Sequence, residues 1–209
     1  MEKLDILVPP RFSKSGVVKT RDQAVNDEDW VGTFNLLVVQ SKPEPAVIYQ
    51  LRSPKTKWAP NKLDVTAGGH YQSGENLFDG LREIKEEIGR SYDQKEIIHI
   101  GRKLNVTPDI LGKMRYYVSD ILLVKDNSPL TSYKLQEEEV AALFICPIEK
   151  LLQLYKNNQS FEAKGINAAG KEIKMIIKNA SFPGNWDNFY FKIIFPVERF
   201  LKGEKNLIY

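Results

Sequence analysis

The chain of 209 residues has one cysteine, two histidines and no long apolar run, and each shortage excludes a class of protein. Cys146 alone cannot form an intramolecular disulfide framework or a multi-cysteine metal site. No stretch approaches the roughly 18 apolar residues that cross a membrane. The first residues, MEKLDILVPP, carry an acid and two prolines where a signal peptide has an apolar core. We therefore expect a cytoplasmic protein without a membrane partner.

The sequence also has no long run of residues with the same charge. The 30 Lys and Arg residues nearly balance the 27 Asp and Glu residues, which leaves a formal charge of +3. Tails that bind nucleic acid usually carry runs of one sign, so we expect no nucleic-acid partner. A mild positive balance is compatible with a small anionic substrate. At 42% hydrophobic residues, the composition is that of a globular protein with one sizeable core.

The pattern of apolar residues predicts a mixed α/β protein in three parts. Residues 1–30 are polar and contain no predicted helix or strand, so they are interpreted as an N-terminal arm. A catalytic domain is expected over residues 31–158, beginning with a hairpin of FNLLVVQ and AVIYQL. Further strands are predicted over 96–106, 114–124 and 140–146, followed by a helix over 147–157. Residues 159–209 form an extension, with a hairpin over 159–178 and a terminal helix over 186–204 interrupted at Pro196.

A helix over residues 75–89 is predicted between a glycine-rich loop and the later strands. Leu77, Leu81, Ile84 and Ile88 recur at spacings of four, three and four, which places them on one helical face. Gly89 is suited to end the helix, because glycine readily adopts the left-handed conformation found after a helix.

Three glutamates share another face of this helix. Glu83, Glu86 and Glu87 lie at positions i, i+3 and i+4, so their carboxylates converge. Like charges at these spacings cost roughly 0.2–0.5 kcal/mol per pair, and a divalent cation would reverse that cost. Magnesium favours a few carboxylates together with phosphate oxygens and waters. A solvated acidic helix face is the alternative interpretation.

The glycine loop and the helix together resemble the Nudix box. That family pattern is Gly, five residues, Glu, seven residues, Arg-Glu, an apolar residue, any residue, Glu-Glu, any residue, Gly and an apolar residue. The matching positions are Gly69, Glu75, Arg82, Glu83, Ile84, Glu86, Glu87 and Gly89. Two positions depart from the pattern: the spacer 76–81 is one residue short, and Arg90 replaces the final apolar residue.

The resemblance implies a fold, an activity and a metal. The fold would be an α/β/α sandwich with a mixed β-sheet, here extended by the C-terminal hairpin and helix. The activity would be hydrolysis of the diphosphate linkage of a nucleoside diphosphate derivative or related organic diphosphate by metal-activated water. The cofactor would be Mg²⁺, with Mn²⁺ as the alternative, and the partner a small-molecule diphosphate.

The resemblance also assigns roles to residues of the box. The metal ligands would be Glu83, Glu86, Glu87 and the carbonyl of Gly69, and Glu86 and Glu87 would be catalytic. Arg82 and Glu75 would brace the loop against the helix. The general base would be either Glu87 or an acid outside the box. Glu138 or Glu139 in QEEEVAAL is the outside candidate, and Glu139 is preferred; a plain acidic loop is the alternative.

Substrate-binding residues are predicted from position and charge. Arg52 and Lys57 follow the second strand and could reach substrate phosphates, although a solvated basic loop would have the same sequence. His70 follows the loop glycines and is assigned either to phosphate binding or to capping of the loop. The C-terminal extension is rich in aromatic residues, including Phe182, Trp186 and Tyr190, and it covers the domain, lines the pocket or forms the interface of a homodimer.

Two other functions fit this sequence less well. Residues 52–75 resemble the isopentenyl-diphosphate isomerase branch, but that enzyme needs a cysteine where this chain has Ala67 and Gly68. It also needs several metal-binding histidines, and the chain has only His70 and His99. A non-catalytic Nudix-like sensor is the second alternative. Such modules usually lose glutamates of the box, and this chain keeps them all.

Overall fold

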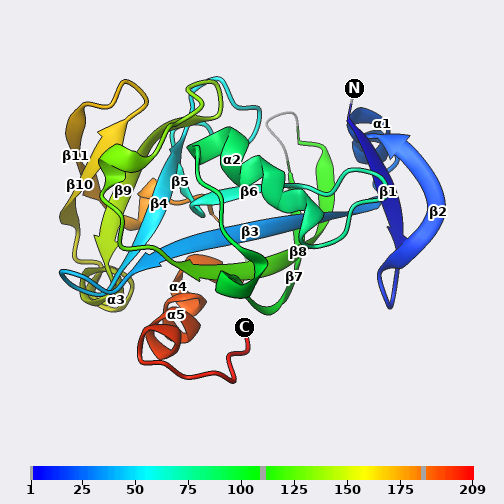
Figure 1. Ribbon diagram of the computed structural model, residues 1–209. Coiled ribbons are helices and arrows are strands. Elements are labelled where there is room, and N and C mark those ends of the chain that lie inside the picture. The colour runs from blue at the N-terminus through cyan, green and yellow to red at the C-terminus, as the bar shows by residue number, and fades with distance from the viewer. Residues whose placement is uncertain (1, 109–111, 185–186) are drawn as a thin grey trace.

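The computed structural model describes residues 2–108, 112–184 and 187–209, so Trp186 of the predicted terminal helix lies outside it (Figure 1). Its strands are β1 (Lys3–Val8), β2 (Ser13–Thr20), β3 (Trp30–Gln40), β4 (Ala46–Arg52), β5 (Leu63–Asp64), β6 (Ala67–His70), β7 (Ile98–Pro108), β8 (Met114–Lys125), β9 (Val140–Pro147), β10 (Phe161–Asn167) and β11 (Glu172–Ile177). Its α-helices are α1 (Arg21–Asn26), α2 (Arg82–Ile88), α3 (Ile148–Asn157), α4 (Phe189–Lys192) and α5 (Ile194–Leu201). Short 3-10 turns are η1 (Asp79–Leu81), η2 (Gln94–Glu96), η3 (Leu130–Ser132) and η4 (Asn179–Ser181).

Strand β3 organises the sheet. Along one edge its first half pairs with β6 and its second half pairs with β4, both antiparallel. Strand β8 runs parallel to β3 on its other side, and β7 continues the sheet antiparallel to β8. The parallel β3–β8 pair makes the sheet mixed, as the sequence predicts. Both predicted hairpins are confirmed as β3–β4 and β10–β11.

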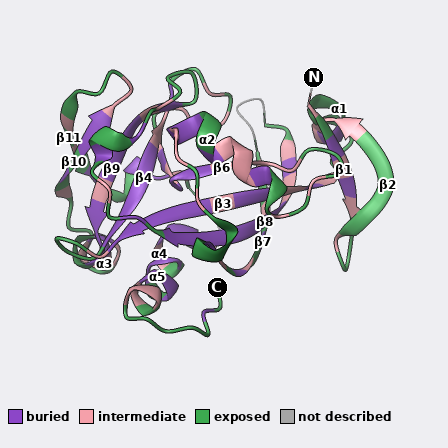
Figure 2. Cartoon of the chain, in the orientation of Figure 1, coloured by how far each residue is buried: buried purple, intermediate pink, exposed green. Residues whose placement is uncertain are grey.

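The sheet is covered by helices on both faces. Successive β3 side chains point to opposite faces because a strand has a period of two. Leu36 and Val38 pack under α2 with Ile84, whereas Leu37 and Val39 pack with α3 and α5. Figure 1 shows α2 and α5 on opposite sides of β3. Figure 2 shows β3 buried along most of its length. The expected α/β/α arrangement is therefore confirmed, and among the described residues no helix has the length and apolar character needed to cross a bilayer.

Residues 1–30, where no helix or strand is predicted, form a hairpin and a short helix. Strands β1 and β2 pair antiparallel, and β1 also pairs with β3, so the arm extends the sheet. Helix α1 begins after Thr20, whose side chain accepts a hydrogen bond from the backbone N–H of Gln23 while the Gln23 side chain accepts one from Thr20. This capping box is a sequence signal for a helix start.

The helix predicted over 75–89 begins later than expected. Regular α-helix starts at Arg82, after the 3-10 turn η1. Residues 75–78 are not helical, because the Asp79 carboxylate accepts a hydrogen bond from the N–H of Asn76 at 2.8 Å and holds a turn at 77–78. The predicted end is confirmed, since Gly89 has φ of +67°.

The terminal helix breaks at Ile193, between α4 and α5, and not at Pro196. Pro196 occupies the first turn of α5, where backbone N–H groups have no partner within the helix, so proline is tolerated there.

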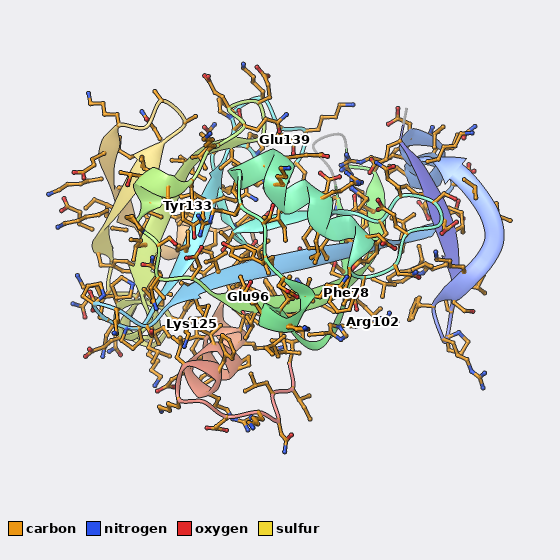
Figure 3. All side chains as sticks on the ribbon, in the orientation of Figure 1. Phe78, Glu96, Arg102, Lys125, Tyr133 and Glu139 are labelled. Atoms are coloured by element: carbon orange, nitrogen blue, oxygen red, sulfur yellow. The ribbon has the colours of Figure 1, made fainter. Side chains whose placement is uncertain are left out.

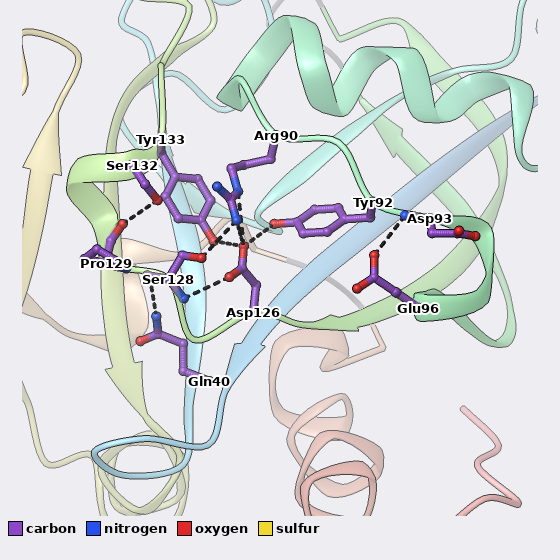
Figure 4. A network of polar contacts seen from close by, with 10 residues as sticks. All are labelled: Gln40, Arg90, Tyr92, Asp93, Glu96, Asp126, Ser128, Pro129, Ser132 and Tyr133. Carbon is purple, nitrogen blue, oxygen red and sulfur yellow. Dashed lines mark hydrogen bonds and ion pairs between the residues drawn. The ribbon is translucent and has the colours of Figure 1, made fainter.

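Arg90, the departure from the box, is the centre of a polar network at the end of α2 (Figure 4). Its guanidinium donates to Oδ2 of Asp126 from Nε at 3.1 Å and from Nη2 at 2.6 Å. The hydroxyls of Tyr92 and Tyr133 donate to the same oxygen at 3.0 and 3.1 Å. Burial disfavours the Asp126 charge, but hydrogen bonds from Ser128, Arg90 and Tyr92 prevail and lower its pKa to about 2. A charged anchor therefore replaces the apolar contact of the family pattern.

Replacement of Asp126 with Asn should lower the free energy of unfolding by about 2 kcal/mol at pH 7. A folded-state pKa below the unfolded value means that this stabilisation is fully present above about pH 4 and is lost as the pH falls towards 2. Urea unfolding of both proteins at pH 7, 4 and 2 measures this change. The exposed Glu172→Gln serves as the control and should show no such difference, and a gap that persists unchanged at pH 2 would contradict the assignment.

Candidate active site

Helix α2 packs directly on strand β6 because β6 carries glycine where the two meet. The N–H of Gly68 donates to Oε2 of Glu87 at 3.2 Å. A Cβ atom at Gly69 would lie 2.6 Å from Cγ of Glu83, and one at Gly68 would lie 2.8 Å from the carbonyl oxygen of Phe34. No larger residue fits at Gly69 without displacing Glu83, so this glycine of the box sets the distance between helix and sheet, whereas Gly68 lets β6 lie close to β3.

The three glutamates of α2 differ in environment. Glu87 is 5% exposed, and burial raises its pKa well above 4.5; the neighbouring charges of Glu139 and Glu83 act in the same direction. Burial also raises the pKa of Glu83, although its hydrogen bond from Arg82 opposes the shift. The side chain of Glu86 is 58% exposed. One buried carboxylate and two more accessible ones thus share a helical face, as the sequence predicts.

Arg82 braces this face from the loop side. Its Nε donates to Oε1 of Glu75 at 2.9 Å, and its Nη1 contacts both Glu83 and Glu86, the latter at 3.5 Å. Glu75 in turn accepts a hydrogen bond from the N–H of Gln72 at 2.7 Å. The shortened spacer therefore leaves Glu75 in contact with Arg82, and both residues lie where a bracing role requires them.

The donor set suits a hard divalent cation. Within the described ranges, no three His, Cys, Asp or Glu side chains are already gathered as a metal site, because Arg82 holds Glu83 and Glu86. The chemistry nevertheless fits. Carboxylate oxygens are preferred ligands of Mg²⁺, and the charges of Glu83 and Glu139 both disfavour ionisation of Glu87. A cation beside these oxygens would reverse that repulsion.

The structure separates the two acids proposed outside the box. Glu139 lies before β9, with its carbonyl oxygen accepting from the N–H of Ser53 at 2.8 Å, and its charge acts on both Glu87 and Glu83. It is labelled close to α2 in Figure 3. Glu138 instead forms an ion pair with Lys55 at 2.7 Å, and its side chain is 66% exposed. Of these two acids, Glu139 is therefore the one whose charge acts on the helix glutamates, whereas Glu138 is paired with Lys55.

A cavity of about 650 Å³ brings the predicted residues together. Its lining includes Arg52, Lys57, Gly69, His70, Arg82, Glu83, Glu86, Glu87, Glu138 and Glu139. Glu75 lies outside the lining, as suits a bracing residue. Residues from the end of β4, strand β6, helix α2 and the loop before β9 thus form one site.

One of the predicted substrate-binding residues, Arg52, is partly committed to protein contacts. Arg52 donates from Nε to the carbonyl oxygen of Trp58 at 2.9 Å, and its Nη1 lies 3.4 Å from Oδ2 of Asp64. Its charge still lowers the pKa of Glu87, which places it beside the carboxylates. Lys57 is exposed at the cavity edge.

His70 faces the cavity and does not cap the loop through a hydrogen bond of its ring. Its Nε2 is buried without a hydrogen-bond partner among the residues that the structure describes. Burial, and then the charges of Arg21 and Arg115, hold its pKa well below 6.5, so the imidazole is neutral at pH 7. A neutral ring can donate or accept one hydrogen bond at the cavity surface.

Sequence reasoning missed the polar floor of the cavity. Thr33, Asn35 and Ser119 interrupt apolar strands and project into the same cavity. The signal was present in the sequence as polar residues at alternate positions of an otherwise apolar strand. The C-terminal extension also lines the cavity through Phe189 and Tyr190, and the Tyr190 hydroxyl donates to Asp64 at 2.7 Å. This places the extension at the pocket, one of the three arrangements expected from its aromatic content.

The chain is similar to known proteins over most of its length. It is 30% identical over 164 residues to an uncharacterized Nudix hydrolase of Clostridium acetobutylicum, a match that covers 75% of this chain and 78% of that protein. It is 31% identical over 168 residues to Nudix hydrolase 3 of Arabidopsis thaliana, covering 77% of this chain but only 21% of that longer protein. No family model matches the chain.

Solved structures support the fold. A Deinococcus radiodurans crystal structure superposes with a TM-score of 0.55 at 21% identity, covering 76% of this chain and 91% of that one. A MutT protein of Methanosarcina mazei superposes with a TM-score of 0.50 at 15% identity, covering 84% of this chain and 96% of the other.

Replacement of Gly69 with Ala should lower kcat for the reaction at this site by about 10- to 100-fold, because the added methyl displaces Glu83. The control is Gly170→Ala, which strains a turn with φ of +76° between β10 and β11, away from the cavity lining. Both variants should unfold at lower temperature than the wild type, and only Gly69→Ala should lose turnover. Equal turnover in the two variants would refute the close-contact argument.

Proposed function

The chain belongs to the Nudix hydrolase family, and from this premise we propose that it hydrolyses the diphosphate linkage of a nucleoside diphosphate derivative or related organic diphosphate in a magnesium-dependent reaction. The observation that carries the proposal is the meeting of Glu83, Glu86, Glu87 and Glu139 with Arg52 in one cavity. These acids and the guanidinium can supply metal ligands, a general base and a phosphate-binding cation for metal-assisted attack on a phosphoanhydride.

The metal would be held by Glu83, Glu86 and Glu87, with the carbonyl of Gly69 as a further ligand; Mn²⁺ is the alternative to Mg²⁺. When bound, the cation supplies positive charge against the phosphate oxygens and favours ionisation of the attacking water. Arg82, which now contacts Glu83 and Glu86, keeps these two carboxylates on the cavity side of the helix.

The protein's own groups perform the remaining tasks. Arg52 and Lys57 orient the diphosphate, because guanidinium and ammonium groups pair with phosphate oxygens. Glu139 is the general base that accepts a proton from the attacking water. It lines the cavity beside Glu87, whereas Glu87 itself is buried and accepts a hydrogen bond from the N–H of Gly68, which suits a ligand. His70 offers a neutral hydrogen-bonding group to the substrate.

An alkene isomerase is disfavoured by the same cavity. The positions that would carry its cysteine are Ala67 and Gly68, and neither has an acidic side chain. The cavity lining contains one histidine, His70, among the described residues. Proton transfer to an alkene needs an acid at the position of the cysteine, and none is present.

Turnover should be detected in a panel of organic diphosphates and should vanish with a chelator. The panel comprises nucleoside diphosphate sugars, dinucleoside polyphosphates, coenzyme A, nucleoside triphosphates and isoprenoid diphosphates, each assayed for release of phosphate or a monophosphate. Restored magnesium should restore the rate. Binding of a nucleotide without turnover of any member would overturn hydrolysis in favour of a sensor.

Replacement of Glu139 with Gln should lower kcat by about 10²- to 10⁴-fold, the usual contribution of a general base. The neighbouring Glu138→Gln is the matched control, because Glu138 is exposed and paired with Lys55. It should change kcat little. The kcat of wild type and both variants is measured from pH 5 to 9, and an equal loss in the two variants would remove Glu139 from the role of base.

A further inference from the structure

A row of side chains crosses four strands on the cavity floor and ends at a lysine. Residue pairing places His70 of β6 opposite Thr33 of β3, Thr33 opposite Ser119 of β8, and Ser119 opposite Lys103 of β7. All four line the cavity. Three inter-strand spacings separate the ends of the row, so Lys103 lies about 14 Å from the β6 strand that carries Gly69.

Lys103 is a buried cation with an incomplete set of partners. Its side chain is 8% exposed, and its nearest carboxylate oxygen, Oδ1 of Asp187, is 3.6 Å from Nζ. The ammonium lies 4.3 Å from the centre of the Phe189 ring. An ammonium has three N–H donors, and burial without acceptors is costly. Burial accordingly lowers the pKa of Lys103, while Asp187 and Asp64 oppose that shift.

Asp187 is already engaged by the C-terminal extension. Its Oδ1 accepts from the N–H of Phe189 at 3.2 Å, and its Oδ2 accepts from the hydroxyl of Tyr209 at 3.1 Å. The carboxylate is therefore committed to the C-terminal extension, lies outside the lining of the cavity, and leaves donors of Lys103 without an acceptor within hydrogen-bonding distance among the described residues. These donors belong to a group that lines the cavity.

We propose that Lys103 is a specificity-determining residue that donates hydrogen bonds to an oxygen-rich group at the far end of the substrate, so that the cavity takes diphosphates of sugars or nucleosides and not of hydrocarbon chains. The inference rests on the proposed function, because it concerns the same cavity. A hydrocarbon chain of comparable length would cover the ammonium and offer it no acceptor. The free-energy cost of removing the charge from water would then not be offset by a hydrogen bond. A sugar or base attached to a diphosphate offers hydroxyl or carbonyl oxygens that can face Lys103 while the diphosphate lies at the glutamates.

The test compares Lys103→Met with the wild type on two probes of opposite character, ADP-ribose and farnesyl diphosphate. Lys192→Met is the matched control, because Lys192 is exposed and lies outside the lining of this cavity. Lys103→Met should raise the KM for ADP-ribose by about 10- to 100-fold with a smaller change in kcat, since a hydrogen bond from a charged group is lost. Lys103→Met should not weaken the use of farnesyl diphosphate and should improve it, because the cost of covering the ammonium is removed. Lys192→Met should match the wild type on both probes.

A second variant separates recognition from a structural role. Asp187→Asn removes the carboxylate nearest to Nζ of Lys103 and keeps the ammonium, so it should retain ADP-ribose binding. If the pair had only a structural role, the two variants would be equally damaging. Equal losses on both probes in Lys103→Met, or an unchanged KM for ADP-ribose, would overturn the inference.

Binding measured by calorimetry tests the role of Lys103 separately from the proposed hydrolysis. ADP-ribose is titrated into wild type and Lys103→Met with a chelator and again with calcium. An absence of turnover with magnesium would overturn hydrolysis alone. A wild type that binds ADP-ribose about 10-fold or more tightly than Lys103→Met would still support the role of Lys103. A wild type that binds farnesyl diphosphate and not ADP-ribose, or binds neither, would overturn it.

Discussion

The contact between helix α2 and strand β6 is the constraint on which the site depends. Glutamates on a helix reach the cavity only if the helix lies close against the sheet, and side chains on β6 would hold it away. Gly69 removes that obstacle beside Glu83, and the N–H of Gly68 then hydrogen-bonds to Glu87. The same closeness buries Glu87 and raises its pKa, so the packing requirement also creates the electrostatic need for a counter-charge.

The C-terminal end of α2 is held by a second, electrostatic anchor. Arg90 occupies a position where the family pattern has an apolar residue, and Asp126 at the end of β8 neutralises it. The two tyrosine hydroxyls complete the set of donors around that carboxylate. Removal of one partner of such a half-buried set would leave an unpaired charge, which costs more than the loss of an apolar contact. The close contact with Gly69 at one side and the ion pair of Arg90 with Asp126 at the end together fix the position of α2. A helix that presents metal ligands needs such a fixed position.

The cavity is assembled from segments that are distant in the chain. Strand β3 supplies polar side chains on one face while its other face packs under α2, because alternate residues point to opposite sides. The loop before β9 brings Glu139, and the C-terminal extension brings Tyr190 and the Asp187 that lies beside Lys103. In the function that we propose, substrate choice therefore belongs to segments outside the box, whereas the chemistry belongs to the box and to Glu139.

The sequence by itself determined what depends on local spacing. The converging glutamates, the end of α2 at Gly89, both hairpins and the mixed α/β class follow from periodicity and from the box. Local signals placed the start of α2 too early, because the Asp79 side chain holds a turn there, and they overlooked the N-terminal hairpin.

Only the tertiary structure decided which groups meet. Glu138 and Glu139 are equivalent in sequence, yet their surroundings separate them, one paired with Lys55 and the other beside Glu87. Lys103 is one of many lysines until strand pairing places it on the cavity floor under the C-terminal extension. The physical reason is that burial and charge proximity arise from long-range packing, which no local pattern of residues encodes.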